Sequence, residues 1–266
     1  MGGDILWRSA AALLLLAGTS QAADLTIPGP EGIALKSRLF EPVESRAAPG
    51  IILLHGCGGP FPVREVQWID GFTKAGHVVL LPDSFSSRGL GSQCNVPERQ
   101  RVATPTGLRR LDALAAANWL AVRSGTPPGG VVIMGWSNGG ATTLAVGADQ
   151  PDTPKGLIRG LIAFYPGCAS ATRSPGLKPV APLLVLVGEA DDWTPAAPCH
   201  ALANSLGSAM TLVTYPGAYH DFDAPDYAIR TRSSSVGLVH VGTDPVARAD
   251  ALQRVPAFIA RLPPAN

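Results

Sequence analysis

The stretch Gly130-Val131-Val132-Ile133-Met134-Gly135-Trp136-Ser137-Asn138-Gly139-Gly140 decides the fold. Its opening run, from Gly130 to Met134, is continuously apolar, as expected of a strand buried on both faces. A tight turn with a serine at its tip follows, and helix-compatible residues continue from Ala141 to Gly147. A strand, a Gly-x-Ser-x-Gly turn and a helix in this order predict a nucleophile elbow, which presents a reactive serine at the edge of a parallel sheet.

The glycines at 135 and 139 support this prediction on steric grounds. A serine held at positive φ brings the residues two positions before and after it close together, and glycine lacks the Cβ atom that would collide there. The helix that follows directs its free N–H groups and its dipole at the oxygen of Ser137, where negative charge would develop.

The rest of the chain alternates short apolar runs with amphipathic segments. We expect strands at Ile33–Phe40, Gly50–Leu54, His77–Leu81, Gly130–Met134, Leu161–Tyr165, Leu183–Val187 and Met210–Tyr215. We expect helices at Glu65–Ala75, Leu108–Arg123, Gly140–Ala148, Pro195–Leu206 and Pro245–Arg261. This alternation predicts a single α/β domain in which helices flank a mostly parallel sheet. The irregular segment Asp223–Thr243 is predicted to be a long loop before the last helix.

Composition limits the classes of partner. The chain has 266 residues, of which 46% are hydrophobic and 15% charged, enough apolar material for one large core. Its net charge of +1 gives no long-range field, so a nucleic acid partner is not expected.

The first 22 residues have the pattern that is typical of a signal peptide. An apolar run from Ala10 to Gly18 follows Arg8, and small side chains stand at Ser20 and Ala22. We predict cleavage between Ala22 and Ala23, which leaves residues 23–266 as the exported domain. The run is too short to span ~30 Å of hydrocarbon comfortably.

A serine hydroxyl needs a base to accept its proton and a carboxylate to orient that base. His220 follows the last predicted strand, at the carboxyl edge of the sheet, and is the expected base, with His240 as the alternative. Asp191 lies on the loop after Leu183–Val187 and is the expected acid. Its neighbour Asp192 is the alternative, and is otherwise expected to cap the next helix.

Two backbone donors are needed for the oxyanion of an acyl-transfer intermediate. The N–H of Asn138, directly after the serine, is one expected donor. The loop after Gly50–Leu54 reads His55-Gly56-Cys57-Gly58-Gly59, and the N–H of Cys57 is the expected second donor.

The chain resembles the dienelactone hydrolase family of α/β-hydrolases. The resemblance rests on the loop at residues 54–59, the stretch Pro82–Gly89, the elbow, the stretch Gly188–Asp191 and the stretch Tyr215–Phe222. It implies a hydrolase without a cofactor and with an eight-stranded sheet. Founding members have a cysteine where this chain has Ser137, which favours a general carboxylic esterase over a lactone hydrolase.

Four cysteines remain in the predicted exported domain. They are expected either to form disulfides in an oxidising compartment or to be free and buried. From the same layout of loops we expect the pairs Cys57–Cys94 and Cys168–Cys199. Arg88 is expected either to bind a substrate carboxylate or to pair with Asp83.

The sequence thus predicts a secreted or periplasmic serine hydrolase that uses Ser137, His220 and Asp191. Its expected partner is a small-molecule ester or lactone, with no metal or organic cofactor and a monomer or small homo-oligomer as the working state. Two alternatives remain at this point: a serine peptidase of the same fold, and a binding protein that retains the fold without catalysis.

Overall fold

The computed structural model describes residues 21–44, 48–123, 130–173 and 178–263. The predicted signal peptide lies outside these ranges, apart from its last two residues, which begin the first strand. Among the described residues, no helix combines the length and apolar character needed to cross a membrane.

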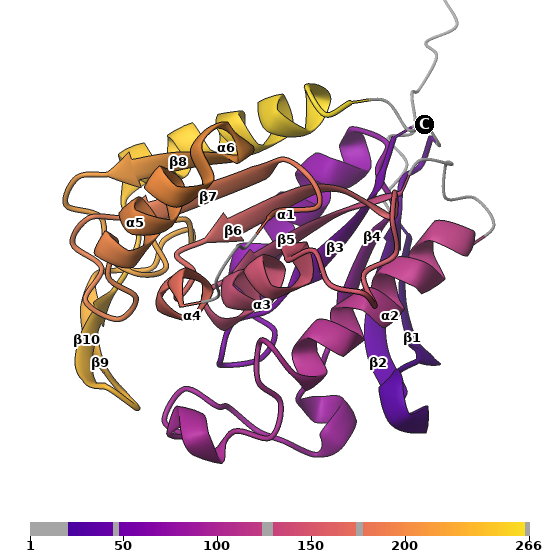
Figure 1. Cartoon of the computed structure of the whole chain (residues 1–266), viewed down its shortest axis with the longest axis horizontal. Helices are drawn as coiled ribbons and strands as arrows, with labels where there is room; N and C mark the ends of the chain where they lie inside the picture. The colour runs from indigo at the N-terminus through magenta and orange to yellow at the C-terminus, as the bar shows by residue number, and fades with distance from the viewer. Residues whose placement is uncertain (1–20, 45–47, 124–129, 174–177, 264–266) are drawn as a thin grey trace, which may run out of the picture.

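Eight strands form one sheet in the order β1-β2-β4-β3-β5-β6-β7-β8 (Figure 1). The strands from β3 onwards pair in parallel, whereas β1 and β2 run antiparallel at one edge. Their bounds are β1 Gln21–Pro28, β2 Ala34–Glu41, β3 Gly50–Leu54, β4 Val79–Pro82, β5 Val131–Trp136, β6 Ile158–Phe164, β7 Leu183–Gly188 and β8 Met210–Tyr215. The predicted α/β-hydrolase fold, a mostly parallel sheet of about eight strands in a single domain, is confirmed.

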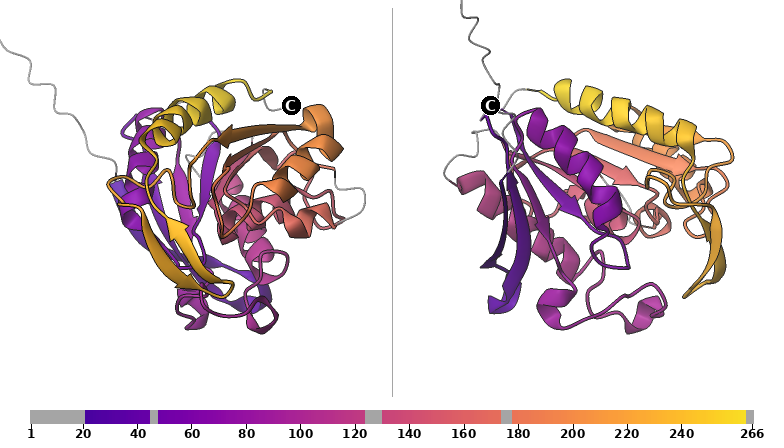
Figure 2. Two further views of the ribbon diagram at one scale, coloured as in Figure 1. Left: turned by 90° about the vertical axis from the view of Figure 1, so that its left-hand side faces the viewer. Right: turned by 180° about the vertical axis from the view of Figure 1, so that it is seen from behind.

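Helices cover both faces of the sheet (Figure 2). Helices α1 (Pro62–Lys74) and α6 (Pro245–Ala260) pack on one face, and α2 (Leu108–Val122), α3 (Asn138–Gly147) and α5 (Ala197–Leu206) pack on the other. A short helix, α4 (Ala169–Thr172), lies beside α5. Strand β5 is buried along its whole length because it contributes side chains alternately to the two cores.

Each of the seven strands expected from the sequence is present, with ends that differ by at most three residues. The eighth, β1, was not among them. It is an edge strand with exposed side chains at Asp24 and Thr26, so it lacks the continuous apolar run that marks the buried strands.

The prediction of a long loop at Asp223–Thr243 was wrong. This segment contains a hairpin of β9 (Arg230–Ser234) and β10 (Gly237–Val241), which lies near the carboxyl ends of β7 and β8 (Figure 1). Strand β9 is rich in arginine and serine, and the two strands form a sheet of their own, which meets the rest of the chain through a bridge between Val241 and His220. The polar sequence of β9 therefore gave little indication of a strand.

Both expected disulfides are present. Cys57 is bonded to Cys94, and Cys168 is bonded to Cys199. The first bond ties the loop after β3 to the long segment between β4 and α2, and the second ties the start of α4 to α5.

Candidate active site

Ser137 lies at the sharp turn between β5 and α3. Its backbone has φ 54° and ψ −115°, a strained conformation for a residue with a side chain. The turn is held by the Ser137 N–H, which donates to the carbonyl of Phe164 at 2.9 Å, and by the Ser137 carbonyl, which accepts from the N–H of Ala141 at 2.8 Å. This is the geometry expected of a nucleophile elbow.

The two glycines of the turn are required by its packing. A Cβ atom at Gly135 would lie 2.3 Å from the carbonyl oxygen of Gly139. One at Gly139 would lie 2.1 Å from the carbonyl oxygen of Leu54, at the end of β3. Gly139 therefore allows the elbow to approach the neighbouring strand as well as to turn.

His220 and Asp191 form a buried pair on the loops after β8 and β7. The Nδ1 atom of His220 lies 2.7 Å from Oδ2 of Asp191, and His220 is 1% exposed. The other carboxylate oxygen of Asp191 accepts from the N–H groups of Trp193 and Thr194 at 2.9 and 2.8 Å. Nδ1 of His220 therefore carries the proton that Asp191 accepts, and Nε2 presents a lone pair.

The pKa values of this pair move in opposite directions. Burial alone disfavours the imidazolium, but the Asp191 carboxylate outweighs burial and raises the pKa of His220 above 6.5. Burial likewise opposes ionisation of Asp191, yet His220 and the hydrogen bonds from Thr194 lower the pKa of that carboxyl below 3.8. Each group thus favours the charged form of its partner.

A hollow of about 220 Å³ joins the serine to this pair. Ser137, His220 and Cys57 all line it. The Nε2 atom of His220 is buried and has no hydrogen-bond partner among the described residues. A larger hollow of about 760 Å³ also reaches Ser137, and Asn138 lines that one. The serine therefore borders two spaces.

The two expected oxyanion donors flank the serine. Asn138 is the first residue of α3, where N–H groups have no acceptor within the helix. Cys57 lies on the loop after β3, which is fixed by the Cys57–Cys94 disulfide and by the N–H of Gln93 donating to the carbonyl of Cys57 at 2.7 Å. A Cβ atom at Gly56 would lie only 3.7 Å from that of Ser137, so this loop runs directly beside the serine.

Arg109 joins these two donor segments, and sequence reasoning missed it. Its guanidinium donates to the side-chain oxygen of Asn138 and, at 2.7 Å, to the backbone carbonyl of His55. Arg109 is 1% exposed, and burial lowers the pKa of its guanidinium to about 9. An arginine on an amphipathic helix is ordinarily solvated, so the sequence carried no sign of this role.

A second buried network lies beneath His220. The ring of Tyr165 stands 4.4 Å from that of His220, and its hydroxyl donates to Asp223 at 2.6 Å. The indole N–H groups of Trp68 and Trp136 donate to the same carboxylate. This network anchors the chain just after the histidine, and no pattern in the sequence indicated it.

Several other expectations are corrected by the structure. Asp192 does not cap α5; its carboxylate accepts from the backbone N–H of His240 at 2.8 Å and lies 2.7 Å from that residue's Nδ1. The residue before α5 is Ala196, with no side-chain cap. His240 is thus paired, but its side chain is 46% exposed and does not line either hollow at Ser137.

Arg88 takes neither of its two expected roles. Its guanidinium binds the buried carboxylate of Asp112 with two hydrogen bonds of 2.7 and 2.8 Å. Asp83 instead accepts from the N–H groups of Phe85 and Ser86 and lies 3.5 Å from Nε2 of His55. The register of α2 decides this pairing, because Asp112 lies within reach of Arg88 only once the helix has packed.

The described part of the chain contains no cluster of side chains suited to hold a metal ion. No three His, Cys, Asp or Glu side chains are grouped there in a way that would hold an ion.

Comparison with known proteins agrees with this geometry. The model of the dienelactone hydrolase family matches residues 35–262. Among solved structures, a dienelactone hydrolase of Anabaena variabilis is similar with a TM-score of 0.65 and 22% identity, over 91% of this chain and 98% of that one. Esterase 2 of Thermogutta terrifontis, in a form phosphorylated by paraoxon, has a TM-score of 0.64 and 19% identity, over 90% and 93% of the two chains. A puromycin-hydrolysing peptidase of Mycobacterium tuberculosis has a TM-score of 0.56 and 21% identity, over 76% of this chain and 36% of that one.

Proposed function

The chain belongs to the dienelactone hydrolase family and is an ester-cleaving hydrolase, and we propose that it acts as a serine esterase through Ser137, His220 and Asp191. One observation carries this proposal. The buried Nε2 of His220 has no hydrogen-bond partner among the described residues, while its Nδ1 is held by Asp191, and the ring borders the same hollow as Ser137. This is the arrangement a general base needs.

The proposed reaction has two halves. Oγ of Ser137 attacks the ester carbonyl carbon while Nε2 of His220 takes its proton, and the resulting oxyanion accepts from the N–H groups of Cys57 and Asn138. When the intermediate collapses, the C–O bond to the alcohol breaks and His220 returns the proton to the alcohol oxygen. Water then attacks the acyl-serine by the same route and releases the acid.

Asp191 acts in this scheme by orientation and charge. It holds the Nδ1–H tautomer of His220, and it stabilises the imidazolium that forms during each proton transfer. Arg109 is a positioning residue, because it contacts Asn138 and His55 and lines neither hollow at Ser137.

The proposed site of action is the periplasm or the exterior of the cell, after cleavage between Ala22 and Ala23. The two disulfides support this, since such bonds persist in oxidising compartments. A serine nucleophile suits the same setting, because a thiolate there is exposed to oxidation.

The proposal is tested by treating the folded protein with paraoxon, followed by peptide mass spectrometry and assay with p-nitrophenyl acetate. We expect one phosphorylated peptide, carrying Ser137, and loss of turnover in proportion to labelling. The Ser137→Ala variant is the control and should remain unlabelled. An unlabelled Ser137 in the folded wild-type chain would favour a binding protein that has lost catalysis.

A serine peptidase of the same fold is the second candidate, favoured by the similarity to the puromycin-hydrolysing enzyme. It would use the same residues, so labelling does not separate the two. Comparison of kcat/KM for an ester and an anilide with the same acyl group distinguishes an esterase from a peptidase. We expect the ester to be preferred, and a preference for the anilide would reverse this assignment.

A further inference from the structure

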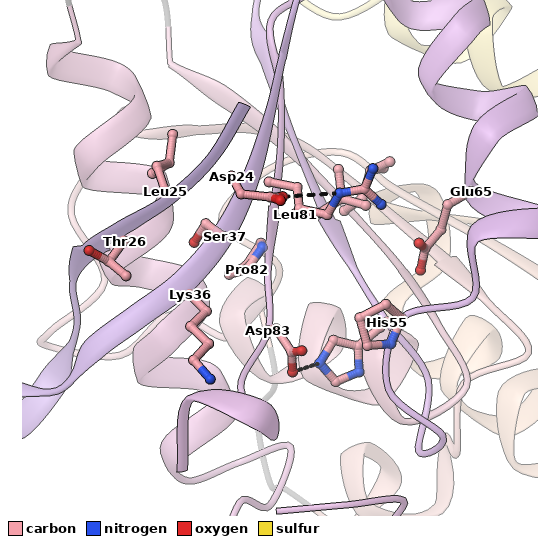
Figure 3. A pocket seen from close by; sticks show the side chains of 13 residues that line it. Asp24, Leu25, Thr26, Lys36, Ser37, His55, Glu65, Leu81, Pro82 and Asp83 are labelled. Atoms are coloured by element: carbon pink, nitrogen blue, oxygen red, sulfur yellow. Dashed lines mark ion pairs between the residues drawn. The ribbon is translucent and has the colours of Figure 1, made fainter. Parts of the chain in front are cut away.

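A third hollow, of about 580 Å³, is not lined by Ser137 (Figure 3). It is bounded by the antiparallel edge of the sheet, the end of β4 and the first turn of α1. The loop after β3 contributes to both spaces, because His55 and Pro60 line this hollow while residues 56–61 line the smaller one at Ser137. We refer to it below as the edge cavity.

Two buried polar atoms at the edge cavity make no hydrogen bond within the described residues, although Asp83 lies 3.5 Å from one of them. They are Nε2 of His55 and Oε2 of Glu65. Both residues line the cavity, and they are 3% and 1% exposed. Burying such atoms without a hydrogen bond is costly, so two of them at one cavity point to a bound ligand.

Both unpartnered atoms act as acceptors. Nδ1 of His55 lies 2.8 Å from the carbonyl of Gly56 and carries the proton, while burial lowers the pKa of the ring and leaves Nε2 as a lone pair. Glu65 already accepts from the N–H of Phe61 through Oε1, and Oε2 is free. Burial raises the pKa of this carboxyl, so a cation at Oε2 would favour its charged, accepting form. Asp83 adds a third acceptor, with Oδ1 3.5 Å from Nε2 of His55.

The two cations at the edge cavity already have partners. The ammonium of Lys36 donates to the carbonyl of Ser86 at 3.3 Å. The guanidinium of Arg38 lies 3.5 Å from the carboxylate of Asp24 and 5.0 Å from the centre of the Phe40 ring. In Figure 3 the side chains of Asp83 and His55 lie side by side, and that of Glu65 approaches the same space from α1.

We infer that the edge cavity binds a small primary ammonium compound with an apolar body. An ammonium has three N–H donors and no acceptor, which matches the acceptors of His55, Glu65 and Asp83. Its charge would also offset the burial of the Glu65 carboxylate. The apolar body would lie against Leu53, Leu81 and Pro82, which line the same space.

The experiment measures binding of benzylammonium chloride to the folded Ser137→Ala chain by titration calorimetry at neutral pH. Benzyl alcohol, which has the same ring and no charge, is the comparison ligand. Since a charge-assisted hydrogen bond contributes roughly 1.5–3 kcal/mol, we expect the ammonium to bind at least ~10-fold more tightly than the alcohol. Equal affinities would overturn the inference in favour of an apolar cavity.

Variants locate the binding. Glu65→Gln keeps the acceptor for Phe61 and removes the charge, and we expect at least a ~10-fold loss of affinity. Asp70→Asn removes the same charge from an exposed position of α1 and should leave affinity unchanged. Thr26→Trp, at an exposed position of β1 that lines the cavity, should block binding without disturbing the buried residues.

Unchanged affinity in both Glu65→Gln and Thr26→Trp would place the ammonium elsewhere and refute the site. Because the protein used cannot form an acyl-serine, this outcome is independent of paraoxon labelling. Either proposal can therefore fail without the other.

Discussion

His220 and His240 each lie beside an aspartate of the loop after β7, and the two pairs differ in burial. The His220–Asp191 pair is almost fully buried, whereas the side chains of His240 and Asp192 are 46% and 40% exposed. An exposed pair exchanges its hydrogen bonds with water and contributes little. Only the buried pair borders the hollow that contains Ser137.

Substitution of the two histidines should therefore have unequal effects. We expect His220→Ala to lower kcat for p-nitrophenyl acetate by roughly 10³-fold or more, because the serine loses its base. His240→Ala should change kcat by less than about 3-fold, since that pair is exposed. Steady-state assays of both variants check this, and a larger loss in His240→Ala would identify the other base.

The raised pKa of His220 predicts the acid limb of the pH profile. Only the neutral imidazole accepts a proton, so kcat/KM should fall as the pH decreases through a value above 6.5. In Asp191→Asn the carboxylate that raises this pKa is lost, and the limb should move to lower pH while kcat falls. A pH series on both proteins measures the shift, and a limb that moves to higher pH would contradict the role given to Asp191.

At the scale of elements, the position of a glycine decides what its replacement does. Gly139 packs against the end of β3, whereas a Cβ atom at Gly71, an exposed position of α1, would meet no atom within 4 Å. Position 139 has no room for a methyl group. At position 71 the glycine itself is destabilising, because it loses more conformational entropy on folding than alanine would.

We accordingly expect Gly71→Ala to raise the free energy of unfolding by about 0.5–1 kcal/mol with activity unchanged. Gly139→Ala should abolish activity and lower stability, because either the elbow or β3 must move. Urea denaturation monitored by tryptophan fluorescence, together with ester assays, compares the two. Retention of full activity in Gly139→Ala would show that the elbow tolerates a shift of β3.

The start of α6 gives a second element-scale prediction. The carboxylate of Asp244 accepts from the N–H groups of Val246 and Ala247 at 3.0 and 2.9 Å, which satisfies two free donors of the first turn. Asp244→Ala should lower the free energy of unfolding by about 1 kcal/mol. Asp244→Ser, which retains a capping oxygen, should recover most of that loss in the same denaturation assay.

At the scale of the whole molecule, two disulfides join segments that are distant in sequence. They close loops with separations of 37 and 31 residues. On chain entropy alone, each should contribute about 4 kcal/mol by restricting the unfolded chain. Only Cys57–Cys94 also holds the loop that contains an expected oxyanion donor.

The two disulfides should therefore differ in their effect on catalysis. Replacing Cys168 and Cys199 together by alanine should lower the melting temperature and leave kcat nearly unchanged. Replacing Cys57 and Cys94 should lower both, because the loop beside Ser137 loses its anchor at Cys94. Thermal melts and ester assays of the two double variants separate these effects, and equal kcat values would exclude that anchoring role.

Local sequence patterns predicted much of this protein. The apolar runs specified seven strands, and the glycines around Ser137 specified the elbow, because strand periodicity and turn sterics act over a few neighbouring residues. The same patterns placed His220 and Asp191 on loops at the carboxyl edge, since parallel strands deliver their ends to one edge. The sequence left open which histidine and which aspartate form the buried pair.

Tertiary structure decided several polar contacts between residues far apart in the chain. It paired Arg88 with Asp112, set Arg109 between Asn138 and His55, and formed the edge cavity around Glu65. These outcomes depend on the register and packing of whole helices against the sheet. No local pattern records that register, because the burial that makes such polar contacts strong exists only once the core has formed.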